Sequence, residues 1–62
     1  MRVTVNGVPR ALPPGSTVAR LVPPRRGVAV AVNGEVVPRS GWERASLRDG
    51  DRVEVLTAAQ GG

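Results

Sequence analysis

Two Asn-Gly pairs, Asn6-Gly7 and Asn33-Gly34, constrain the fold of this chain more than any other feature of its sequence. Each pair stands between two short apolar runs, in VTVNGVPRAL and in GVAVAVNGEVVP. Asn-Gly suits a type I′ turn, because both central residues of that turn need a positive φ. The pattern therefore predicts two β-hairpins with two-residue turns.

A two-residue turn also fixes the register of each hairpin. In the first hairpin the predicted pairs are Val5 with Val8, Val3 with Arg10, and Met1 with Leu12. In the second they are Val32 with Glu35, Ala31 with Val36, and Val30 with Val37. The first register gathers five apolar side chains and one arginine on one face, as expected for a hairpin that packs on a core.

Between the hairpins the apolar positions change from a strand period to a helical one. They are Val18, Leu21 and Val22, at i, i+3 and i+4. Ser16 or Thr17 is available as N-cap, and Pro23-Pro24 stops the helix. We expect a helix of about six residues, because the residue before a proline disfavours the α region. So short a helix must pack on the sheet to persist.

The stretch LRDGDRVEVLT predicts a turn at Asp49-Gly50 and one last strand. Val53 and Val55 share one face of that strand, whereas Leu56 lies on the face that also carries Arg52 and Glu54. The order of elements predicts an α+β fold, with a mixed sheet and one short helix packed on one face.

The chain has no cysteine and no histidine. A disulfide framework, a cysteine zinc site and a thiol nucleophile are therefore excluded, and the usual neutral-pH acid-base residue is missing. The net charge of +4 leaves nucleic acid, acidic partners and simple solubility open. Without a long apolar run or a signal peptide, we expect a cytoplasmic protein with no membrane contact.

Two other features have a structural interpretation. Trp42, in the loop before the last strand, is more typical of a packing anchor than of a ligand platform. Asp49 and Asp51 flank Gly50 and are interpreted as turn residues, since two carboxylates without further ligands are too few for a metal site.

Three stretches of the chain resemble the β-grasp, or ubiquitin-like, fold, and more closely the sulfur carrier proteins of thiamine biosynthesis, the ThiS family. They are VTVNGVPRALPPGSTVARL, GVAVAVNGEVVPRSGW and LRDGDRVEVLTAAQGG, in family order and covering nearly the whole chain. The last is the most specific. The resemblance implies a β-grasp domain over residues 1–57 and a flexible tail over residues 58–62. One departure is Pro23-Pro24, since family members usually have a longer helix there.

The resemblance also implies a function. In that family an E1-like adenylating enzyme uses ATP and magnesium to activate the terminal glycine carboxylate. The carboxylate becomes a thiocarboxylate that donates sulfur to a thiazole synthase. By resemblance Gly62 carries the sulfur, supplied by a donor such as a cysteine desulfurase. The stem that threads into partners comprises Ala58, Ala59, Gln60 and Gly61, and glycines fit where a Cβ would clash. The chain would then be a carrier rather than an enzyme, with no cofactor or metal of its own.

Leu56 and Val36 are candidates for docking the adenylating enzyme, because ubiquitin-like proteins use an apolar patch on the helix-free face of the sheet for this purpose. An isolated exposed leucine, however, needs no functional explanation. The paired glycines by themselves also fit a frayed terminus.

Several other functions remain open on the sequence. A carrier for molybdopterin, cysteine or a secondary metabolite would use the same tail, and a protein modifier would be joined through Gly62 to lysines of its targets. An RNA-binding β-grasp module is a further alternative. The single aromatic residue and the scattered arginines argue against nucleic acid.

Overall fold

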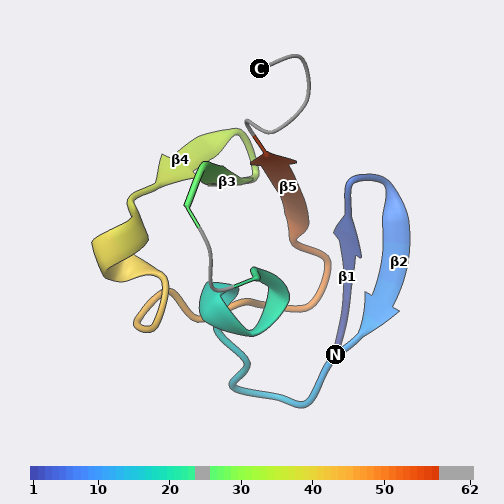
Figure 1. Ribbon diagram of the computed structural model, residues 1–62. Coiled ribbons are helices and arrows are strands. Elements are labelled where there is room, and N and C mark those ends of the chain that lie inside the picture. Colours follow the sequence, from blue (N-terminus) through green and yellow to red (C-terminus); the bar gives the residue numbers. More distant parts are fainter. Residues whose placement is uncertain (24–25, 58–62) are drawn as a thin grey trace.

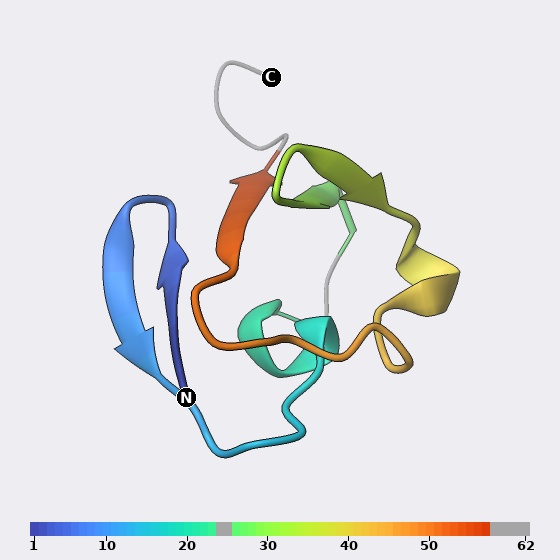
Figure 2. The ribbon, with the colours of Figure 1, turned by 180° about the vertical axis from the view of Figure 1, so that it is seen from behind.

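The computed structural model describes residues 1–23 and 26–57, and in this part of the chain five strands form one mixed sheet (Figure 1). The strands are β1 (Arg2–Val5), β2 (Val8–Ala11), β3 (Val28–Val32), β4 (Glu35–Val37) and β5 (Arg52–Thr57). Their order across the sheet is β2-β1-β5-β3-β4. β5 runs parallel to β1 and antiparallel to β3, so the last strand joins the two hairpins (Figure 2).

Both hairpins form in the predicted register. Asn6 and Gly7 have φ angles of 51° and 82°, and Asn33 and Gly34 have 52° and 85°. These positive values are the ones a type I′ turn requires. The turns pair Val5 with Val8 in β1–β2 and Val32 with Glu35 in β3–β4, and the remaining pairs follow from them.

The predicted helix is only a single 3-10 turn, η1 (Val18–Leu21). Thr17 occupies the N-cap position without a side-chain cap bond, and the Ser16 hydroxyl donates to the Pro13 carbonyl instead, at 2.7 Å. Val22 precedes Pro23 and is already extended, with φ −114° and ψ 133°. So little chain is left between Thr17 and Val22 that the shorter i→i+3 bonds form in place of an α-helix.

A neighbouring loop stabilises this turn. The backbone N–H groups of Val18 and Ala19 donate to the carbonyls of Ala45 and Trp42, at 3.0 Å and 3.1 Å, and the N–H of Leu47 donates to Ser16 at 2.9 Å. This loop follows a second 3-10 turn, η2 (Arg39–Gly41), which the sequence pattern did not predict. The first N–H groups of any helix have no acceptor within it, and here the loop supplies the acceptors for Val18 and Ala19.

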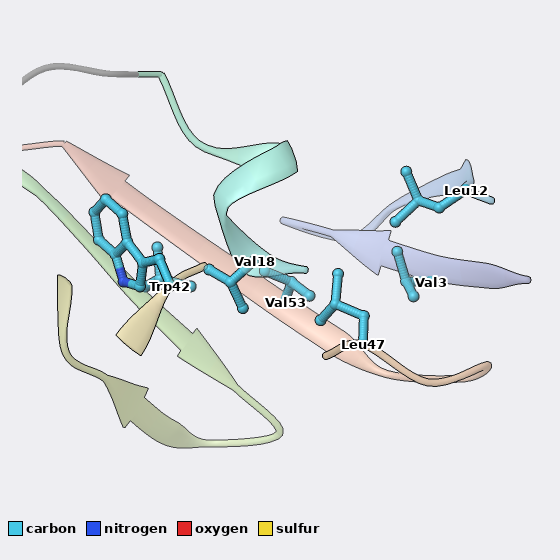
Figure 3. Close-up of a cluster of buried hydrophobic side chains, with 7 residues drawn as sticks. Val3, Leu12, Val18, Trp42, Leu47 and Val53 are labelled. Atoms are coloured by element: carbon cyan, nitrogen blue, oxygen red, sulfur yellow. The ribbon is translucent and has the colours of Figure 1, made fainter. Parts of the chain in front are cut away.

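The core lies between η1 and one face of the sheet (Figure 3). Its buried members are Val3, Leu12, Val18, Val30, Trp42, Leu47 and Val53. Val18 and Val53 have no exposed surface, so the turn and the central strand β5 meet at the middle of this core. The alternation predicted for the last strand is confirmed, since Val53 is buried and Leu56 is exposed.

Candidate functional site

The proposed tail follows directly from β5. Thr57 is the last residue of β5 and pairs with Val28 of β3. The residues predicted to thread into partners and to carry sulfur, Ala58, Ala59, Gln60, Gly61 and Gly62, lie outside the described residues. The site can therefore be built only up to the root of the tail, which we define as Val55–Thr57.

Leu56 and Val36 lie on the same face of the sheet, on either side of β3. Leu56 is opposite Ala29 and Val36 is opposite Ala31, and directly opposed residues project from the same face. Leu56 is 67% exposed and Val36 is 77% exposed. Small alanine side chains separate them, so these four residues form a low apolar surface, called the open-face patch below.

The open-face patch is next to the root of the tail. Leu56 belongs both to the patch and to the root of the tail, and it is the second-last residue of β5. A partner that covers the patch would therefore meet the start of the tail in the same encounter. Glu54 projects from the same face of β5 as Leu56 and is opposite Ala31, which gives the patch a charged border.

Asn6, the residue after β1, forms two hydrogen bonds with Val55 in the root of the tail. Its side-chain Oδ1 accepts a hydrogen bond from the Val55 N–H at 2.8 Å, and its Nδ2 donates to the Val55 carbonyl at 3.1 Å. Asn33 holds the beginning of β5 in a similar way, because its Oδ1 accepts from the Arg52 N–H at 3.0 Å. Both asparagines were predicted only as turn residues, and their contacts with β5 connect segments far apart in the sequence.

A model of the ThiS family matches residues 3–62, a range that includes the predicted tail. The chain belongs to the ThiS family. It is similar over its whole length to a solved structure, the thiamine biosynthesis protein ThiS from Geobacter metallireducens. The two share 35% identity and a TM-score of 0.80, and each chain is fully covered. The β-grasp fold expected from the sequence is thereby confirmed.

A curated relative shows the same similarity within a much longer protein. Over 66 residues this ThiS-family chain is 33% identical to a thiazole synthase of Paramagnetospirillum magneticum. The chain is fully covered by that match but spans only 20% of the length of the relative.

Trp42 acts as a packing anchor in this ThiS-family domain, as the sequence indicated. It is 7% exposed, and its Nε1 donates to the Val37 carbonyl at 2.8 Å. The Arg39 guanidinium lies 5.3 Å from the centre of its ring, at cation–π distance. A surface hollow beside the ring is also lined by Ala19 and Val22.

Asp49 and Asp51, in the loop before β5, stabilise this loop as hydrogen-bond acceptors. Asp51 accepts from the Arg48 N–H at 2.8 Å and from Asn33 Nδ2 at 3.0 Å, while Asp49 accepts from the Arg2 N–H at 2.7 Å. Within residues 1–23 and 26–57 no three metal-ligating side chains gather at one point. No helix of this same part is long and apolar enough to cross a membrane.

Proposed function

We propose that this domain is a sulfur carrier of thiamine biosynthesis and that the carboxylate of Gly62 is the group that carries the sulfur. Membership of the ThiS family and the whole-length likeness to a ThiS protein support this role. The observation that carries the proposal is that the family match extends through Gly62, so the similarity includes the proposed sulfur-carrying end as well as the fold.

The chemistry divides between the chain and its partners. The chain supplies a carboxylate, and an E1-like adenylating enzyme supplies ATP and magnesium. The carboxylate oxygen of Gly62 attacks the α-phosphorus of ATP and pyrophosphate leaves, which gives an acyl adenylate. A sulfur nucleophile then attacks the acyl carbon and AMP leaves. When the nucleophile is the persulfide of a cysteine desulfurase, a thiol reductant cleaves the resulting acyl disulfide and releases the thiocarboxylate.

The residue composition is consistent with this division of labour. A carboxylate becomes a good electrophile only after adenylation, so the carrier needs no catalytic side chain of its own. The chain has no histidine and no cysteine, the residues that most often act as acid-base catalyst and nucleophile. We therefore propose a carrier in the cytoplasm, where ATP is plentiful, and not an enzyme.

The open-face patch is the proposed docking surface for the adenylating enzyme. Its leucine and valine are both exposed, and the leucine belongs to the root of the tail. Docking there would leave the tail free to enter the partner's active site along the direction of β5. Binding energy from the patch would offset the translational and rotational entropy lost on association.

Thiazole synthase is the proposed acceptor of the sulfur. In the Paramagnetospirillum relative, a segment similar to this whole chain is part of a protein named thiazole synthase. Two functions joined in one polypeptide act at a high effective concentration, which favours pairs that work together.

Intact mass spectrometry tests the proposal. The chain is incubated with ATP, magnesium, an adenylating enzyme of the ThiS pathway, a cysteine desulfurase and cysteine. We expect a mass gain equal to the replacement of one oxygen by sulfur, and no gain in a variant that lacks Gly62. An unchanged mass with an enzyme that is active on another carrier would overturn the proposal. Conjugates joined to other proteins through Gly62 would instead indicate a protein modifier.

A further inference from the structure

The side chain of Asn6 continues the pairing between β1 and β5 after β1 has ended. The backbone N–H groups of Thr4 and Asn6 donate to the carbonyls of Asp51 and Val53, at 3.0 Å and 2.9 Å. The next residue of β5 that faces β1 is Val55, but the chain has already turned away at Asn6-Gly7. The amide of Asn6 replaces the missing backbone, since it offers one acceptor and one donor to the same residue.

Without this amide, the β1 side of Val55 would face solvent. β1 ends at Val5, and the hairpin then leads away to β2. Strand ends with few hydrogen-bonded neighbours open more readily than the middle of a sheet, and their amides exchange faster. The two bonds of Asn6 therefore reduce fraying of the last residues of β5, and they do so at the root of the tail.

The bonds to Val55 also hold the two residues that follow it, one in the proposed docking surface and one at the start of the proposed tail. Val55 immediately precedes Leu56 of the open-face patch, and Thr57 follows as the last described residue. If this segment frays, Leu56 is no longer held in its place on the open face and Thr57 no longer has a fixed position. A partner would then have to order both on binding, at the cost of backbone entropy.

We propose that Asn6 is a positioning residue of the carrier, which holds the root of the tail in the direction that the adenylating enzyme accepts. The inference rests on the proposed function, because it assumes that Gly62 is presented to that enzyme. Asn6 takes no part in the reaction and acts through the backbone of Val55.

Asn33 provides a matched control within the same chain. It has the same turn position and nearly the same φ, 52° against 51° for Asn6. Its side chain also holds β5, but at Arg52, at the opposite end of the strand from the tail. Glycine at either position keeps the positive φ of the turn and removes only the side-chain amide.

The experiment compares N6G and N33G with the wild type. Adenylation is followed as pyrophosphate release at a temperature well below the melting point of each variant, and amide hydrogen exchange is measured at Val55. We expect N6G to exchange faster at Val55 and to lose about tenfold in kcat/KM, which corresponds to ordering about one residue. For N33G we expect kcat/KM within about twofold of the wild type, at a comparable loss of stability.

A second variant isolates the donor. N6D keeps an oxygen that accepts from the Val55 N–H but turns a second oxygen toward the Val55 carbonyl, so we expect a kcat/KM at or below that of N6G. Equal kcat/KM values for N6G, N6D and N33G, with all three folded, would overturn the role of Asn6. Failure of the wild type itself to be adenylated would count against the proposed function instead, so the two failures are distinguishable.

Discussion

The indole N–H of Trp42 donates a hydrogen bond of 2.8 Å to the carbonyl of Val37, the last residue of β4. This bond ties the loop that supports η1 to the edge of the sheet. The Arg39 guanidinium stands over the same ring at 5.3 Å. Trp42 thus contacts η1 through its backbone carbonyl, β4 through its indole N–H and η2 through its ring.

We expect the substitution W42F to reduce the free energy of unfolding by about 2 kcal/mol, because the Val37 carbonyl loses its donor and the smaller ring leaves a gap. R39A removes only the cation–π contact at an exposed position and should cost about 0.5 to 1 kcal/mol. Urea unfolding followed by far-UV circular dichroism measures both, since W42F removes the only tryptophan. An equal cost for the two variants would contradict the anchoring role of the hydrogen bond.

Truncation of the open-face patch should weaken partner binding without unfolding the domain. For L56A we expect KM for adenylation to rise about tenfold with kcat little changed, the behaviour of an interface residue that contributes uniform binding. V8A is a matched control, because Val8 is 58% exposed and projects from the other face of the sheet. A KM for L56A equal to that of V8A, with both proteins folded, would exclude the patch as the docking surface.

Val18 tests how much the single helical turn contributes to stability. Its side chain is fully buried, so V18A should reduce the free energy of unfolding by about 2 to 3 kcal/mol. For a domain of this size such a loss lowers Tm by about 10 °C or more. V36A removes the same two methyl groups from an exposed position and should change stability by less than about 0.5 kcal/mol. Similar melting points for the two variants would mean that η1 does not stabilise the fold.

Several features of the tertiary structure gave no signal in the sequence. Asn6 and Asn33 read as turn residues in a local pattern, yet each also bonds to β5. Trp42 could be interpreted as a packing residue, but nothing near it in the sequence identified Val37 as its partner. The helical period at Val18 was real, whereas the length and type of the helix depended on Pro23 and on a loop distant in sequence.

The sequence by itself determined the two hairpins and their registers, because a two-residue Asn-Gly turn specifies the pairing of its flanking residues through local backbone geometry. It also determined the inward and outward faces of β5 through simple alternation. Only the tertiary structure decided that β5 lies between β1 and β3, because this order depends on burying the apolar faces of both hairpins in one core. That placement brings Leu56 and Val36 to one face and Asn6 to Val55, and these relations at the root of the tail cannot be read from neighbouring residues.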